Sequence, residues 1–118
     1  MISLRQGEIV EETFPVNCKF GKSILYLTNM GIMIENIKGA ILDLGLESIL
    51  SLQPLDGKKG KIIWKEDNAV CDFVFGCESI LELTTKYRTV LKKQSSLKTW
   101  SDTDETRIII ENPVLKPS

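Results

Sequence analysis

Short apolar runs alternate with clusters of turn-forming residues along the sequence from residue 8 to residue 75. The turn clusters recur about every 8–12 positions, a spacing typical of a barrel or sandwich of antiparallel strands. This pattern predicts a β-rich domain built from seven strands. The first strand is expected within Glu8–Cys18, and the others at Ser23–Thr28, Ile32–Asn36, Ala40–Leu44, Ser48–Leu52, Lys61–Lys65 and Ala69–Phe75.

Turn chemistry separates the predicted strands. The tripeptide Asn29-Met30-Gly31 is expected to reverse the chain because Asn and Gly tolerate positive φ. The segment Pro54–Gly60 contains Pro, Asp and two Gly, which predicts a loop. The polar tripeptide Glu66-Asp67-Asn68 is expected to turn the chain into the last strand.

The spacing of apolar residues changes from that of a strand to that of a helix after Cys77. One stripe at helical spacing contains Ile80, Leu83, Tyr87 and Leu91. The pattern predicts a single long helix over Cys77–Lys93, with this stripe packed on the sheet. Residues 1–93 are therefore expected to form the domain.

The remaining residues, 94–118, have the composition of a linker and tail. Residues 94–106 are polar. Residues 107–111 contain Ile108, Ile109 and Ile110, which predict a short added strand. Because isoleucines on an open strand edge promote aggregation, we expect them to pack on this domain or on a neighbour.

The composition excludes several classes of chemistry. The chain of 118 residues has no histidine, so it lacks Ser-His and Cys-His nucleophile pairs and imidazole zinc sites. The cysteines Cys18, Cys71 and Cys77 form no Cys-x-x-Cys pair, which favours small core residues in a reducing compartment. We predict a protein that is not an enzyme and that uses no metal or cofactor.

Charge and hydropathy limit the partners and the location. The formal net charge of −1 gives no global attraction to nucleic acid or to an anionic bilayer, so such binding would need a local patch. No apolar run approaches the roughly 18 residues of a membrane helix, and Met1–Val10 does not resemble a signal peptide. We predict a cytoplasmic protein with neither a nucleic-acid partner nor a small-molecule substrate, and with a peripheral membrane position as the alternative.

The order of elements resembles the pleckstrin-homology-like superfamily. Gly7-Glu8 resembles the start of GRAM-type and bacterial PH-like domains, and Gly21–Glu35 resembles their second and third strands. Leu44–Leu52, followed by Phe73, Phe75 and the helix, completes a similarity that covers roughly residues 5–93. The chain also resembles the GLUE-type domains of endosomal sorting adaptors.

One departure from this superfamily is that Met30-Gly31 stands where relatives often carry a basic residue. The resemblance implies a mainly β fold, a seven-stranded antiparallel, partly open PH-like barrel capped by one C-terminal α-helix. It also implies a non-catalytic docking domain of a larger adaptor.

Lysines supply the candidate anion site. Lys58, Lys59 and Lys61 lie around two glycines, where they either cradle a phosphate or lipid headgroup or belong to a solvated turn. Lys19 and Lys22 lie between the first two strands, where the resemblance places inositol-phosphate ligands. Acidic Glu66 and Asp67 are expected near that place and would repel a phosphate.

Exposed apolar residues supply the candidate protein-binding surface. Phe20 lies beside Gly21 in a turn, while Trp100 and Ile109 lie in the tail. Aromatic side chains outside a core often mark partner contacts. Trp64 belongs either to such a surface or to the core, because strand alternation allows both.

Three functions follow from these features. The first is protein–protein docking within a larger protein, by strand addition or in a groove beside the helix. The second is peripheral binding of anionic lipid through the five lysines. The third is a purely structural domain that braces its neighbours.

Overall fold

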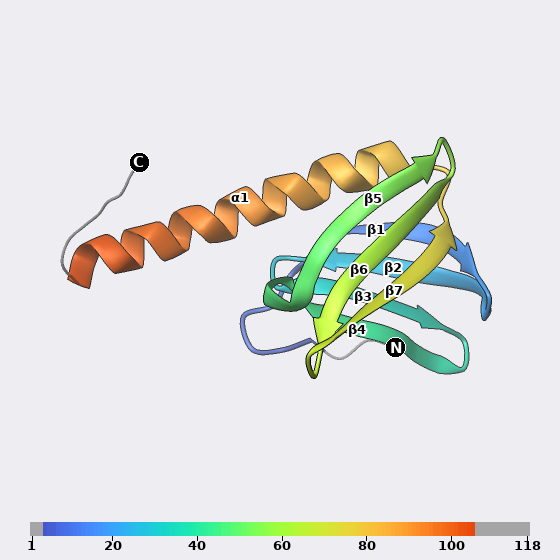
Figure 1. Ribbon diagram of the computed structural model, residues 1–118, viewed down its shortest axis with the longest axis horizontal. Helices are drawn as coiled ribbons and strands as arrows, with labels where there is room; N and C mark the ends of the chain where they lie inside the picture. The colour runs from blue at the N-terminus through green and yellow to red at the C-terminus, as the bar shows by residue number, and fades with distance from the viewer. Residues whose placement is uncertain (1–3, 106–118) are drawn as a thin grey trace. The chain divides into compact units, whose positions relative to one another are not determined.

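A computed structural model describes the backbone of residues 4–105 and the side chains of residues 4–94. It contains seven strands, a short 3₁₀ helix and one long helix, in agreement with the predicted order of elements (Figure 1). The elements are β1 (Val10–Cys18), β2 (Gly21–Thr28), β3 (Gly31–Asn36), β4 (Gly39–Gly45), η1 (Leu46–Ser48), β5 (Ile49–Asp56), β6 (Lys59–Glu66), β7 (Ala69–Gly76) and α1 (Ile80–Glu105).

All seven strands belong to one antiparallel sheet in the order β4-β3-β2-β1-β7-β6-β5. Strands β4 and β5 are its edges, so the sheet is not closed. The pairing of β1 with β7 is limited to Asn17 and Gly76, whereas the other neighbours pair over many residues. The predicted fold class, a mainly β and partly open antiparallel barrel with one C-terminal helix, is therefore confirmed.

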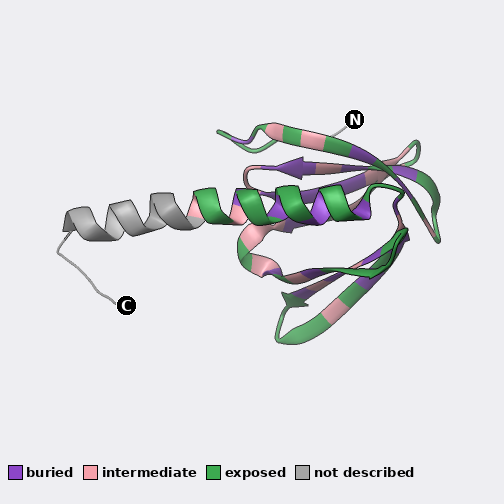
Figure 2. Ribbon diagram, turned by 90° about the horizontal axis from the view of Figure 1, so that it is seen from above, coloured by how far each residue is buried: buried purple, intermediate pink, exposed green. Residues whose placement is uncertain are grey.

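The core follows from the alternation of side chains along each strand. In β2, Ser23, Leu25 and Leu27 are buried while Lys22 and Ile24 are exposed. Figure 2 shows the same alternation of buried and exposed residues on several strands. Large side chains in this core include Phe14, Leu25, Leu27, Ile32, Ile34, Ile62, Trp64, Phe73 and Phe75. Trp64 is thus a core residue, and its indole N–H donates to Glu66 Oε1 at 3.1 Å.

The first turns of α1 belong to the same compact unit as the strands, which extends through Arg88. Ile80, Leu83 and Tyr87 are buried, as the helical stripe predicts. A methyl group at Gly60 would overlap Ile80 Cδ1, so β6 lies close to the start of the helix. Lys86 Nζ donates to Glu12 Oε1 at 3.1 Å, which ties this part of α1 to β1.

The helix is longer than the sequence pattern predicts. It continues past Lys93 to Glu105, because residues 94–105 contain neither proline nor glycine to end it. Leu91 is only half-buried, whereas its neighbour Val90 is buried. The predicted strand at residues 107–111 lies outside the described residues. Among the residues that the structure describes, no helix is both long enough and apolar enough to cross a membrane.

Two turns differ from expectation. The segment Pro54–Gly60 is mostly strand, since β5 runs to Asp56 and β6 starts at Lys59. Only two residues connect these strands, and Asp56 Oδ1 accepts a hydrogen bond from Lys58 N at 2.8 Å. Gly31 does not have the positive φ expected of it. Asp67 and Asn68, which connect β6 to β7, have positive φ values of 50° and 68°.

The segment before β1 is held by a buried carboxylate. Glu8 Oε2 accepts a hydrogen bond from Thr28 Oγ1 at 2.6 Å, and Glu8 Oε1 accepts one from Arg5 N at 2.9 Å. Thr28 Oγ1 also accepts from Met30 N and Gly31 N, at 3.0 Å and 2.9 Å. One hydroxyl therefore connects the N-terminal segment to the turn between β2 and β3.

Replacing this hydroxyl is expected to destabilise the fold. Thr28→Val keeps the side-chain shape but leaves two backbone N–H groups without this acceptor and removes one hydrogen bond from the buried Glu8 carboxylate, at a cost of about 2 kcal/mol. Urea denaturation measures the change. Thr13→Val is the matched control because Thr13 is exposed on β1. Equal midpoints for the two variants would show that the hydroxyl contributes no stability.

Candidate functional site

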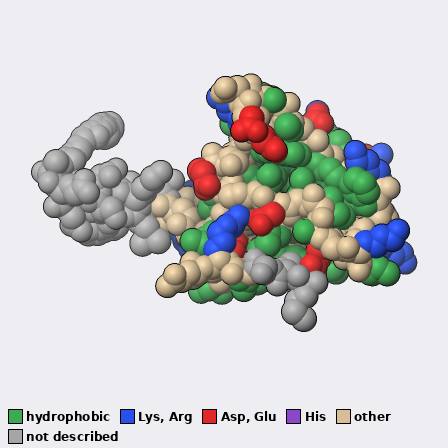
Figure 3. Space-filling model, turned by 90° about the horizontal axis from the view of Figure 1, so that it is seen from below, with side chains coloured by type: hydrophobic (Ala, Val, Ile, Leu, Met, Phe, Trp, Pro, Cys, Tyr) green, Lys and Arg blue, Asp and Glu red, His purple; other side chains and the backbone are tan. Residues whose placement is uncertain are grey.

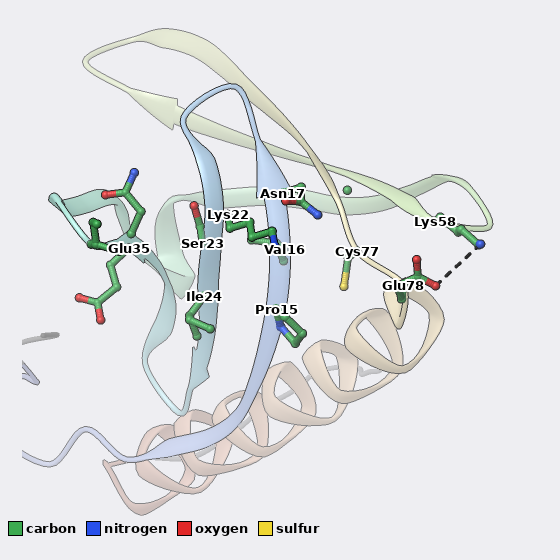
Figure 4. Close-up of a pocket in the computed structure, with 13 residues that line it drawn as sticks. Pro15, Val16, Asn17, Lys22, Ser23, Ile24, Glu35, Lys58, Cys77 and Glu78 are labelled. Atoms are coloured by element: carbon green, nitrogen blue, oxygen red, sulfur yellow. Dashed lines mark ion pairs between the residues drawn. The ribbon is translucent and has the colours of Figure 1, made fainter.

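A groove of about 710 Å³ opens beside the β1–β2 hairpin (Figure 4). Its lining comes from β1 and β2, from the end of β3, from the β5–β6 turn and from the junction of β7 with α1. The apolar lining includes Pro15, Ile24 and Ile37. Ile24 is 38% exposed and Ile37 is 99% exposed, so the groove is open to solvent.

Strand register places the lining residues side by side. Pro15 is opposite Ile24, and Ile24 is opposite Glu35, so three adjacent strands contribute neighbouring side chains. On the other side of the groove, Cys77 N donates to Lys58 O at 2.8 Å. This bond holds the β5–β6 turn against the junction of β7 with α1.

Two cations and two carboxylates line the groove: Lys22, Lys58, Glu35 and Glu78. Lys58 Nζ lies 3.8 Å from Glu78 Oε1, and both side chains are exposed (Figure 4). An exposed pair of this kind contributes little stability, so both groups remain available to a partner. The lining thus carries balanced charge on an apolar surface.

Glu35 is held in its ionised form. Tyr26 Oη donates to Glu35 Oε2 at 2.8 Å, which lowers the pKa of the Glu35 carboxyl and raises the pKa of the Tyr26 hydroxyl. A hydrogen bond to the charged form of a carboxyl favours that form. Glu35 therefore presents a negative charge to the groove at neutral pH.

Cys77 lines the groove but is not a reactive thiol. It is buried, and this burial raises the pKa of the thiol. Because the thiolate is the nucleophile, a raised pKa makes the side chain inert at neutral pH. All three cysteines are free thiols; Cys18 and Cys71 are half-buried.

The five lysines predicted to bind an anion do not form one site. Lys22 and Lys58, from distant parts of the sequence, both line the groove. Lys59 and Lys61 lie on β6, on either side of buried Gly60, and Lys61 is 3.7 Å from Asp72. Strand alternation directs the lysines away from the core. The Lys19 ammonium group lies over the Phe20 ring, with Nζ 5.3 Å from the ring centroid.

Of the three predicted partner-binding residues, Phe20 is the one whose side chain the structure describes. Phe20 is exposed in the β1–β2 turn. Trp100 lies in α1, beyond the described side chains, and Ile109 lies outside the described residues. Sequence reasoning missed Ile24, Ile37 and Glu78. Ile37 had a detectable signal, since it is an isoleucine between Asn36 and Gly39, where a polar turn residue is usual.

Within residues 4–94, no group of three or more acidic or cysteine side chains is arranged to hold a metal ion. No family model matches the sequence, and no curated protein matches it.

Proposed function

We propose that this domain is a non-catalytic docking module of the PH-like type and that it binds a segment of a partner protein in the groove. The proposal is supported by the lining of the groove, which combines apolar Pro15, Ile24 and Ile37 with two cations and two carboxylates. An apolar surface with a few polar groups that fix orientation is the chemistry of a recognition site.

The charge of the lining favours a peptide over a phosphorylated ligand. Glu35 and Glu78 lie in the same groove as Lys22 and Lys58, so a ligand of high negative charge meets repulsion as well as attraction. A peptide with an aliphatic side chain between one acidic and one basic residue would suit an apolar lining that carries both signs of charge. The open form of the groove agrees with this, since small-molecule sites enclose most of their ligand.

Selection of displayed random peptides on the immobilised full chain tests the proposal. Selected peptides should bind wild type, and Ile24→Asp should weaken their binding by about tenfold or more, because it places a charge on the apolar surface. Ile9→Asp is the matched control, since Ile9 is an exposed isoleucine outside the groove lining.

Two outcomes would contradict the proposal. The first is that selection enriches no sequence, as expected of a purely structural domain. The second is that the enriched peptides bind Ile24→Asp as well as wild type. Thermal melts of both variants separate a loss of binding from a loss of folding.

A further inference from the structure

The sequence that follows α1 contains a short run suited to the groove. Arg107-Ile108-Ile109-Ile110-Glu111 places three isoleucines between one basic and one acidic residue. Three consecutive isoleucines in contact with solvent promote aggregation, so such a run needs a surface that covers it. Residues 107–111 are called the tail segment below.

The order of charges in the tail segment is that of a groove ligand. Alternate side chains of an extended chain share one face, so Arg107, Ile109 and Glu111 fall on the same face of an extended segment. Four residue steps place the two charged ends about 13 Å apart. An extended tail segment therefore presents a basic, an aliphatic and an acidic side chain in sequence.

The lining of the groove has the complementary order. Figure 4 shows Glu35 and Lys58 at opposite ends of the lining, with Ile24 and Pro15 between them. The groove thus runs from an anion across an apolar surface to a cation. On the face drawn in Figure 3, hydrophobic side chains likewise lie between separate groups of basic and acidic ones.

Both charged ends of the groove can accept a ligand charge. The hydrogen bond from Tyr26 Oη keeps Glu35 ionised. Lys58 Nζ is 3.8 Å from Glu78 Oε1, and both side chains are exposed to solvent. An exposed ion pair of this length is weak, so a carboxylate of a ligand can replace Glu78 beside Lys58.

We propose that the tail segment of one copy of this chain binds in the groove of a second copy, which returns its own tail segment to the first. The basic end of the tail segment meets Glu35, and its acidic end meets Lys58. Ile109 packs on Ile24 between these ends. This assignment rests on the proposed function, because it names a second copy of the chain as the occupant of the same groove.

The length of α1 prevents a chain from filling its own groove. Lys58 pairs with Glu78, two residues before α1, whereas the tail segment follows the end of α1 at Glu105. A helix of 26 residues is about 39 Å long. The six residues from Glu105 to Glu111 span at most about 22 Å when fully extended, so Glu111 falls short of Lys58 in the same chain.

An antiparallel pair of α1 helices allows both contacts at once. The groove includes Glu78 at the start of α1 and the tail segment follows its end, so each tail segment meets the groove of the other copy. Two equal contacts about a two-fold axis close the assembly at two copies. Once one tail segment is bound, the other is held near its groove, which strengthens the pair beyond either contact alone.

The charge along α1 favours the antiparallel direction. Its middle carries basic residues without an acidic one among them, and its end carries acidic residues. The basic residues are Lys86, Arg88, Lys92, Lys93 and Lys98, and the acidic residues are Asp102, Asp104 and Glu105. Acidic residues in the last turn oppose the helix dipole, and this last turn has no basic residue. An antiparallel neighbour brings basic residues to that end.

Sedimentation velocity of the full chain over a range of concentrations tests the inference. Wild type is expected to pass from the mass of one chain to that of two as the concentration rises. Ile109→Asp and Ile24→Asp should each raise the dissociation constant by about tenfold or more, because each places a charge in the same apolar contact. Val114→Asp, beyond the tail segment, and Ile9→Asp, outside the groove lining, are the matched controls and should associate as wild type does.

Mixing two weakened variants tests whether the contact runs between copies. Ile24→Asp keeps an intact tail segment and Ile109→Asp keeps an intact groove, so a mixed pair retains one complete contact. An equal mixture should therefore associate more tightly than either variant alone. Lys58→Glu and Glu111→Lys should each weaken association, and the double variant should restore it, because the two charges then attract again.

Three results would overturn the inference. The first is a wild type that keeps the mass of one chain at every concentration. The second is a dimer that Ile24→Asp and Ile109→Asp leave unchanged, and the third is a dimer that Ile24→Asp weakens and Ile109→Asp does not. Thermal melts confirm that each variant is folded.

A synthetic peptide of residues 105–113 separates this inference from the proposed function. The peptide should bind Ile109→Asp, whose own tail segment does not compete for the groove. If selected random peptides bind the groove and this peptide does not, the occupant is a different protein and the proposed function stands alone. If neither binds, both proposals fail.

Discussion

Leu83→Asp is expected to leave the domain unfolded at 25 °C. Leu83 is 0% exposed in the first turns of α1, and burying a leucine contributes roughly 1.5–3 kcal/mol. The substitution removes this contribution and also places a carboxyl group in the core, which costs several kcal/mol more. The sum is comparable with the lower part of the roughly 5–15 kcal/mol that stabilises an ordinary domain.

Leu81→Asp is the matched control for this prediction. Leu81 is 65% exposed and lies two residues earlier in the same helix, where an acidic side chain suits the positive end of the helix dipole. Lys59→Ala, on an exposed residue of β6, should likewise melt as wild type does. A near-ultraviolet circular dichroism melt of Leu83→Asp that matches wild type would show that the helix does not pack on the sheet.

Gly31→Ala is expected to destabilise the domain by about 3 kcal/mol. A methyl group at Gly31 would overlap the backbone carbonyl oxygen of Leu44. Because that oxygen belongs to the backbone of β4, it cannot move aside as a flexible side chain does. The strands β3 and β4 would have to separate where Gly31 pairs with Gly45.

Gly45→Ala provides the comparison within the same hairpin. A methyl group there meets the end of the Glu47 side chain, which is exposed and can rotate away. Urea denaturation of both variants should therefore show a large shift of the midpoint for Gly31→Ala and a small one for Gly45→Ala. Shifts of equal size would mean that the close approach of Gly31 to β4 does not limit the packing.

The strands were predictable because local signals agree with the final fold. Polar and apolar residues alternate along β2, and Ile80, Leu83 and Tyr87 recur at helical spacing. Each pattern depends on a single element, and each matches the burial observed. The end of α1 was not predictable in the same way. Polar composition alone indicated a linker after Lys93, although no residue there forbids a helix.

The groove could not be predicted because it depends on contacts between distant segments. Lys22 and Lys58 meet there because Gly76 pairs with both Asn17 of β1 and Lys59 of β6. No local pattern in the sequence indicates that meeting. The role of Gly31 was also not predictable from the sequence. Glycine is needed there because the backbone of Leu44 lies close to it, and not because the chain adopts the turn conformation that the neighbouring residues suggested.

We propose that recognition takes place in the groove beside the β1–β2 hairpin and not at a sheet edge. The most direct test is the change in backbone amide chemical shifts when a selected peptide is added to the labelled chain. We predict changes centred on Ile24, Ile37 and Glu78, with the edge-strand amides of Leu50 and Ser51 unaffected. Changes confined to β5 would instead indicate strand addition at the open edge and would contradict the account.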